Sequence, residues 1–177
     1  MSEMTSKRFH PAHVAIHWLM ALLVLMMLAA GKFVMPGIPP EAPQKPQALQ
    51  LHAYIGGAIA LLLIVRLVLR FTVKRPAPAD AGNAFLNFLA KAVHFLLYFV
   101  LIGMAASGLE LFQLANLPAV FSGAAPYPAN FFDYLPRVGH GLFSWVLLAL
   151  VVLHFGAAMF HQFVKKDNLL ARMWFGK

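Results

Sequence analysis

Two histidines enclose an apolar stretch late in the sequence. His140 and His154 are the first and last residues of HGLFSWVLLALVVLH, and none of the residues between them is charged. In an α-helix their offset is close to four turns, so both side chains lie on nearly one face, roughly 21 Å apart along the axis. Because the hydrocarbon core of a bilayer is only about 30 Å thick, the spacing predicts two imidazoles at two depths of one membrane-spanning helix.

Three other histidines are expected at the same two depths. His52 falls at the depth of His140, near the start of its own apolar run. His17 and His94 fall at the depth of His154. Ionisable side chains inside a membrane are costly and usually face the bundle interior, a cofactor or a partner. One layer therefore offers a single pair, whereas the other offers His154 with either of two partners.

Two stacked histidine pairs in a four-helix bundle suit two b-type haems. Neutral imidazole is a good axial ligand, and ligand sites in bundles are built from facing helices. A zinc site is less favoured, because its ligands converge on one point. The chain has no cysteine, which excludes thiolate metal sites, iron–sulfur clusters and covalent haem attachment. Any redox chemistry would therefore need a cofactor held by histidine.

Three arginines are candidate partners for haem propionates. Arg66 lies about four helical turns beyond His52 on nearly the same face, and Arg70 lies one turn further. Arg137 precedes His140 by about one turn. The alternative is that these arginines only extend toward the membrane surface and fix the topology.

Two further histidines lie at the start of the first apolar run. His10 is expected to be structural, because a single histidine near a membrane interface is more often hydrogen-bonded than metal-bound. His13 lies one turn before His17 on the same face. We interpret His13 as interfacial too, although it is an alternative ligand or proton-handling group.

The composition indicates the elements that must position these side chains. Of 177 residues, 61% are hydrophobic and 11% are charged, whereas a soluble domain carries about 25% charged residues. Four apolar runs, at about 13–35, 50–71, 88–112 and 138–164, are long enough to cross a bilayer, and breaker-rich segments connect them. We therefore expect an all-α integral membrane protein with one four-transmembrane-helix domain over residues 1–177.

The basic residues predict an orientation in the membrane. The net charge is +8, and eleven of the fourteen Lys and Arg residues fall on one side of the predicted bundle. These are Lys7, Arg8, Arg66, Arg70, Lys74, Arg75, Lys91, Lys165, Lys166, Arg172 and Lys177. The positive-inside rule then places both termini in the cytoplasm. Because the cations flank apolar runs rather than form a patch interleaved with aromatic residues, nucleic-acid binding is not expected.

Together these residues resemble the bacterial cytochrome b561 family, which includes superoxide oxidases. The resemblance spans nearly the whole chain and is carried by His17-Trp18, His52, the segment RLVLR at 66–70, His140, His154 and the tail KDNLLARM at 166–173. It implies that His17, rather than His94, pairs with His154. It also implies that His52 pairs with His140, and that electrons pass between two haems b and a membrane quinone in the bacterial inner membrane.

His161 matches a family histidine near the quinone end of the bundle. It lies two turns beyond His154 on a similar face. The family often has a second histidine directly after it, where this chain has Gln162. His161 and His94 are therefore candidates to relay the protons that quinone reduction needs.

Two functions remain open at this level. In the first, the protein is an enzyme that oxidises superoxide at the outer face and passes the electron through both haems to ubiquinone. Lys32, Lys45 and Arg137 would then attract the anion, and Arg137 and His161 are the candidate catalytic residues. In the second, it is a non-enzymatic electron-carrier subunit that receives electrons from a separate dehydrogenase or a soluble cytochrome.

Overall fold

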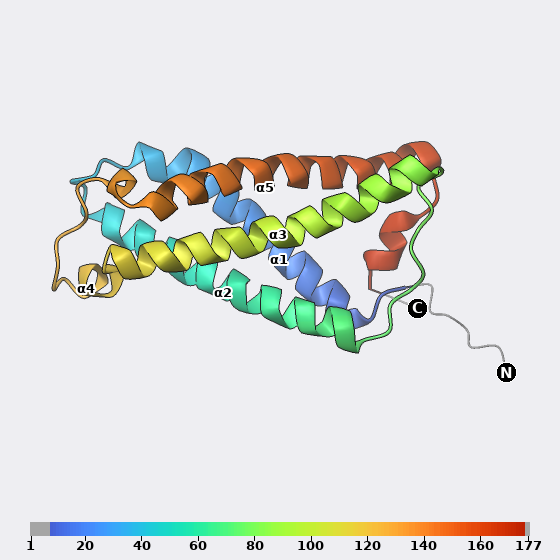
Figure 1. Ribbon diagram of the computed structural model, residues 1–177, viewed down its shortest axis with the longest axis horizontal. Helices are drawn as coiled ribbons and strands as arrows, with labels where there is room; N and C mark the ends of the chain where they lie inside the picture. The colour runs from blue at the N-terminus through green and yellow to red at the C-terminus, as the bar shows by residue number, and fades with distance from the viewer. Residues whose placement is uncertain (1–7, 176–177) are drawn as a thin grey trace.

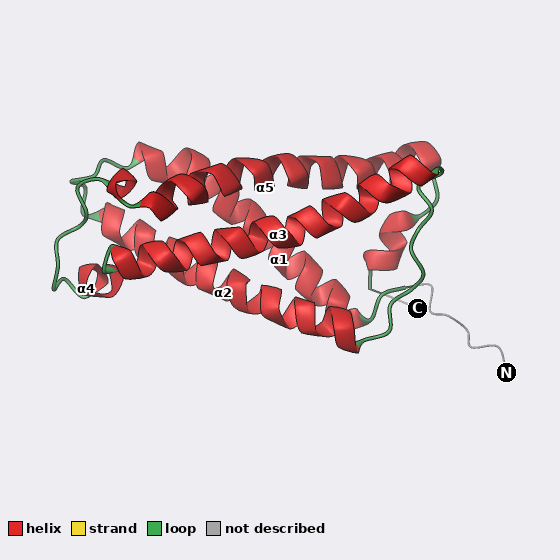
Figure 2. Cartoon of the chain, in the orientation of Figure 1, coloured by secondary structure: helices red, strands yellow, loops and turns green. Residues whose placement is uncertain are grey.

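The computed structural model describes residues 8–175 and consists of helices and loops, with no strand in that range (Figure 2). Lys7 and Lys177, counted above among the cations, lie outside the described residues. The long helices are α1 (Pro11–Ala29), α2 (Gln44–Thr72), α3 (Ala84–Leu114) and α5 (Leu135–Met159). A π-helical turn (Ala30–Val34) and a 3-10 turn (Met35–Gly37) extend α1, and a second π-helical turn (Phe160–Lys165) extends α5. Shorter helical segments are α4 (Leu117–Phe121), Phe131–Asp133 and Leu169–Met173.

All four long helices are long and apolar enough to cross a membrane, so the predicted four-helix membrane fold is confirmed. All four begin a few residues earlier than expected. Pro46 lies near the start of α2 and Pro136 in the first turn of α5, where proline costs no helical hydrogen bond. The side chain of Asn83 accepts a hydrogen bond from the Leu86 amide and caps α3.

The first and last described residues lie at the same end of the bundle (Figure 1). We call this the terminal end, and the opposite end, with the α1–α2 and α3–α5 connections, the distal end. The Phe9 amide donates to the Arg172 carbonyl at 3.1 Å. The Trp18 indole N–H donates to the Met173 carbonyl at 2.7 Å, so the C-terminal 3-10 segment is fastened to the start of α1.

The interior of the bundle is formed mainly by α1, α3 and α5. Its buried core comprises Val24, Leu28, Val93, Val100, Leu147 and Leu150. Gly103 on α3 makes room for the ring of Phe143, because a Cβ at Gly103 would lie 2.6 Å from the Phe143 Cζ. Many large apolar side chains point outward instead, among them Phe71, which is 82% exposed. An apolar outer surface of this kind suits contact with lipid.

The third connection contains a short helix that the sequence did not predict. Its α4 begins with Pro118 in the first turn. Ala115, Leu117 and Val120 form a small buried cluster there, packed against residues of α2 and α3. The breaker residues of this segment indicated a connection, but they did not reveal its apolar packing at the distal end.

Candidate functional site

His52 on α2 and His140 on α5 face each other near the distal end. Their ring centroids lie 6.1 Å apart and their planes are inclined at 64°. We call these two residues the distal pair. The structure therefore brings together the two histidines that the sequence assigned to one depth.

The hydrogen bonds around His140 indicate which of its nitrogens is protonated. Ser107 of α3, which is buried, donates its hydroxyl hydrogen to the Met104 carbonyl at 3.1 Å. A hydroxyl has only one hydrogen to donate. Its oxygen therefore accepts from the Nδ1–H of His140, 3.0 Å away. The Nε2 of His140 is left with a free lone pair, the form in which imidazole binds a metal.

His52 carries a buried nitrogen without a partner. Within residues 8–175, its Nδ1 is the buried side-chain polar atom that makes no hydrogen bond. Buried polar atoms in folded proteins are nearly always paired. An unpaired imidazole nitrogen inside a membrane bundle therefore indicates a partner that does not belong to the chain.

Glycines lie against both rings of the distal pair. A Cβ at Gly108 would lie 3.4 Å from the Cε1 of His140, and a Cβ at Gly31 would lie 3.9 Å from the Cε1 of His52. The absence of side chains at these two positions keeps the space beside the imidazoles open.

Two cations lie near the distal pair. The Lys32 Nζ donates to the Ser144 hydroxyl at 2.7 Å and lies 3.7 Å from the centroid of the Trp145 ring. The Arg137 Cζ lies 4.8 Å from the centroid of the Phe132 ring. Both cations are close enough to act electrostatically on His140. Two of the three cations expected at this end therefore lie beside the distal pair.

Lys45 is the third cation expected at this end, and its contacts differ from those of Lys32 and Arg137. Its Nζ donates to the carbonyls of Met35 at 2.6 Å and Ile38 at 2.8 Å. These bonds fasten the turn that follows α1 to the start of α2.

Three histidines meet at the other depth. The ring centroids of His17 on α1 and His154 on α5 lie 6.2 Å apart, with the planes inclined at 73°. His94 on α3 also approaches His154, with centroids 5.2 Å apart. We call His17, His94 and His154 the terminal triad. The Nδ1–H of His94 donates to the Ala90 carbonyl at 2.6 Å, within its own helix.

The spacing of the rings can be compared with that of two axial ligands. An imidazole nitrogen binds a metal at about 2 Å, so two rings on opposite sides of one iron have centroids roughly 6 Å apart. The distances of 6.1 Å for the distal pair and 6.2 Å for His17 with His154 fit this spacing. The 5.2 Å between His94 and His154 is shorter. Among the described residues, no group of three or more His, Cys, Asp or Glu side chains could hold a metal ion.

Arg66 lies beside the terminal triad. Its Nε donates to the Tyr98 hydroxyl at 3.1 Å, and it acts electrostatically on both His17 and His154. Arg70 follows one turn later, with its Cζ 5.3 Å from the centroid of the Tyr98 ring. Tyr98 therefore holds both arginines close to α3.

The two N-terminal histidines make local contacts. The His10 Nδ1 accepts from the Ala12 amide at 3.2 Å and caps α1. His13 is 5% exposed, and its Nε2 donates to the Leu69 carbonyl of α2 at 3.1 Å. His13 therefore makes a structural contact that joins the start of α1 to the last turns of α2.

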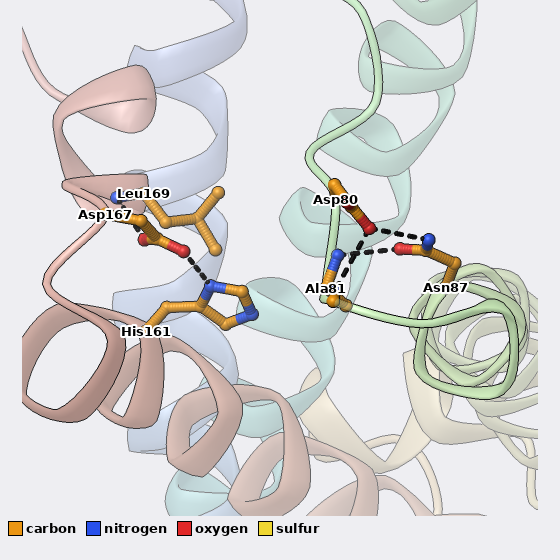
Figure 3. A network of polar contacts seen from close by, with 7 residues as sticks. Asp80, Ala81, Asn87, His161, Asp167 and Leu169 are labelled. Carbon is orange, nitrogen blue, oxygen red and sulfur yellow. Dashed lines mark hydrogen bonds and ion pairs between the residues drawn. The ribbon is translucent and has the colours of Figure 1, made fainter.

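His161 forms an ion pair at the terminal end. Its Nδ1 lies 2.5 Å from the Oδ2 of Asp167 (Figure 3). The hydrogen bond from His161, helped by the Leu169 amide, holds the pKa of the Asp167 carboxyl below its usual range. An open groove at the same end includes the chain neighbours of this pair, and it is lined by Arg8, Gln162, Phe163, Asn168, Leu170, Ala171, Trp174 and Phe175.

Sequence reasoning missed three of the polar side chains that surround the histidines. Ser107 and Tyr98 come from α3, and the sequence has no local pattern that links them to His140 or Arg66. In the sequence, Asp167 stands out only as part of the tail KDNLLARM at 166–173. Its position soon after His161, at the end of the last helix, is a signal that could have indicated the ion pair.

Comparisons with known proteins find relatives that match nearly the whole chain. A family model described as prokaryotic cytochrome b561 matches residues 8–176. Cytochrome b561 homolog 2 of Escherichia coli (strain K12) is 27% identical over 96% of this chain and 92% of its own length. A protein of Yersinia pestis named probable superoxide oxidase CybB is 27% identical over 94% of this chain and 96% of its own length. Cytochrome b562 of Cereibacter sphaeroides is 25% identical, covering 90% of each chain.

Proposed function

The chain belongs to the prokaryotic cytochrome b561 family, and we propose that it carries electrons from superoxide through two haem b groups to ubiquinone. Family membership makes it a haem b-binding electron-transfer protein that crosses the bacterial inner membrane several times. Beyond this, we propose the number of haems, their ligands, the electron donor and the electron acceptor.

The distal pair holds one haem, and His17 with His154 holds the other. The observation that carries this assignment is the pair of ring separations, 6.1 Å and 6.2 Å, which leave room for an iron between the imidazoles. The Ser107 contact supports it, because it fixes His140 with a free Nε2 lone pair. His94 is not assigned to this iron, because its ring centroid lies only 5.2 Å from that of His154, closer than two ligands of one iron would lie.

Haem propionates need cationic or hydrogen-bonding partners. Arg66 and Arg70 serve the haem at the terminal end. Proximity supports this, because Arg66 acts electrostatically on His17 and His154 and Arg70 follows one turn later. Bound haem supplies one-electron redox chemistry, and these residues hold and orient it.

The terminal end faces the cytoplasm and the distal end faces the outer side of the membrane. The basic residues of the terminal end support this orientation through the positive-inside rule. Lys32 and Arg137 then lie on the side from which superoxide arrives, where they raise the encounter rate of a small anion. Oxidising superoxide to oxygen at a haem edge needs no general acid or base.

Charge reversal at Arg137 tests this steering role. Arg137→Glu is expected to slow the reaction with superoxide roughly threefold to tenfold at low salt, and Arg137→Gln by less. Rising salt should shrink the difference, because the screening length is about 10 Å at 0.1 M. Stopped-flow measurements across ionic strength, with haem spectra as the control, check this. Equal rates in the wild type and the Glu variant, with intact haems, would remove Arg137 from the steering role.

Quinone binds at the terminal end, near His161. Reducing one quinone takes two electrons and two protons, and two superoxide ions supply the electrons as they become oxygen. His161 has a second ring nitrogen available for the protons. A groove that begins at the next residue, Gln162, is lined by Phe163, Leu170 and Trp174.

A non-enzymatic electron carrier is the second candidate function. The distal end favours it in one respect, because Phe132 is 64% exposed and Leu135 is 83% exposed there. Apolar side chains at this end suit contact with a donor protein. Two of the relatives are named only as cytochromes.

One assay separates the two functions. Purified protein in lipid nanodiscs would be mixed with a short-chain ubiquinone and a source of superoxide. The enzyme is expected to form quinol at a rate that superoxide dismutase abolishes. Haem that stays oxidised under superoxide, in protein whose haem content is intact, would favour the carrier and contradict the superoxide reaction.

A further inference from the structure

We propose that Asp167 is the positioning residue that aims His161 at the quinone, so that the His161 Nε2 delivers the protons for quinone reduction. The inference rests on the proposed function, because it assumes that quinone is reduced at the terminal end.

The backbone is irregular on both sides of the His161–Asp167 contact. His161 lies in the π-helical turn Phe160–Lys165, and such turns occur frequently at functional sites. Lys166 and Asn168, which flank Asp167, have left-handed backbone conformations with φ of 54° and 56°. Asparagine tolerates this region, but lysine rarely adopts it. The chain therefore accepts strain where it turns the Asp167 carboxylate back onto His161.

Each oxygen of the carboxylate has a separate partner. The Oδ2 accepts from the His161 Nδ1–H at 2.5 Å, and the Oδ1 accepts from the Leu169 amide at 3.2 Å. The amide fixes the carboxylate, and the carboxylate fixes the imidazole. His161 is well enclosed, with 12% of its side chain exposed, whereas 34% of the Asp167 side chain is exposed.

This contact determines which nitrogen of His161 can exchange protons. Because Nδ1 is bonded to the carboxylate, Nε2 lies on the opposite side of the ring and is directed away from Asp167 (Figure 3). A carboxylate beside one ring nitrogen fixes the tautomer and stabilises the protonated ring. For each electron that reaches the quinone, Nε2 gives one proton to a quinone oxygen and regains one from cytoplasmic water.

The surroundings of the carboxylate are compatible with this role. Lys165 acts electrostatically on Asp167 and favours its ionised form. Gln162 and Asn168, next to the two members of the pair, line the open groove. A quinone head group in that groove would contact Gln162 and Asn168, the chain neighbours of His161 and Asp167.

Asp80 provides a matched control at the same end of the bundle. Its Oδ1 accepts from the Gly82 amide at 3.0 Å and the Asn87 side chain at 2.8 Å (Figure 3). Those bonds hold the pKa of the Asp80 carboxyl below its usual range, with a small contribution from Lys165. Asp80 therefore resembles Asp167 in charge, lysine neighbour and local bonding, but its hydrogen bonds do not involve an imidazole.

The test follows reoxidation of pre-reduced haems by a short-chain ubiquinone, without oxygen, in a stopped-flow instrument. Asp167→Asn is expected to slow the maximum rate about tenfold or more, with the quinone concentration for half-maximal rate unchanged. The slowed reaction should show a larger solvent isotope effect in D₂O, and Asp167→Glu should restore part of the rate. Asp80→Asn should behave like the wild type.

The outcomes separate this inference from the proposed function. If ubiquinone does not reoxidise the wild-type haems, quinone is not the acceptor and the proposed function fails. If the wild type reacts but Asp167→Asn is within twofold of it, the positioning role is wrong. Equal slowing by Asp80→Asn, or loss of haem from Asp167→Asn, would also overturn it, since either result indicates a structural role.

Discussion

If each histidine pair holds one haem, as we propose, replacing His140 with alanine is expected to leave the protein with one haem instead of two. Without that imidazole, the iron beside His52 keeps one axial ligand, and Gly31 and Gly108 offer no replacement. His52→Ala should therefore lose the same haem, whereas His17→Ala and His154→Ala should lose the other. Redox titration monitored by absorbance should show a single remaining component, with one potential common to the first two variants and a different one common to the other two.

His94→Ala is the comparison that decides the pairing at the terminal triad. The His94→Ala protein should retain both haems. In the wild type the His94 ring lies only 5.2 Å from that of His154, which is too short for two ligands of one iron. If His94→Ala removes a haem and His17→Ala removes none, the pairing is wrong. His10→Ala is a suitable control, because His10 caps α1 and lies outside both histidine groups.

Replacing Gly108 with leucine is expected to remove the distal haem without changing a ligand. Even a Cβ at this position would lie 3.4 Å from the Cε1 of His140, so the longer leucine side chain must occupy space beside the imidazole. Well-packed sites tolerate such insertions poorly. About half of the haem should be lost, and the remaining component should match that of His140→Ala.

The neighbouring Leu109 supplies the control for that variant. Leu109 is 59% exposed on the outer surface of α3, so Leu109→Ala should retain both haems. Haem content per chain and redox titration measure both variants. A Gly108→Leu protein with two haems at unchanged potentials would show that the space beside His140 is not used.

The depth of the histidines could be predicted from the sequence, because helix rise and apolar length fix it. That reasoning assigns His52 and His140 to one layer, and the structure places their ring centroids 6.1 Å apart. The choice between His17 and His94 could not be made the same way. Both lie at the depth of His154, and their distances from it depend on how α1 and α3 are rotated about their axes.

Contacts between residues that are far apart in the chain could not be predicted from the sequence either. The Ser107 hydroxyl reaches His140 only because α3 packs against α5, and the α4 cluster forms only because it covers α2 and α3. The Asp167 contact depends on left-handed backbone at Lys166, which residue type alone argues against. Helix existence follows from local composition, whereas these contacts follow from packing.

The number of haems per chain tests the central claim most directly. Haem b would be extracted from fully loaded, purified protein, measured as its pyridine complex, and divided by the chain concentration from quantitative amino-acid analysis. Two histidine pairs, each spaced to hold an iron, predict two haems per chain. A value of one in fully loaded protein would contradict the two-site account.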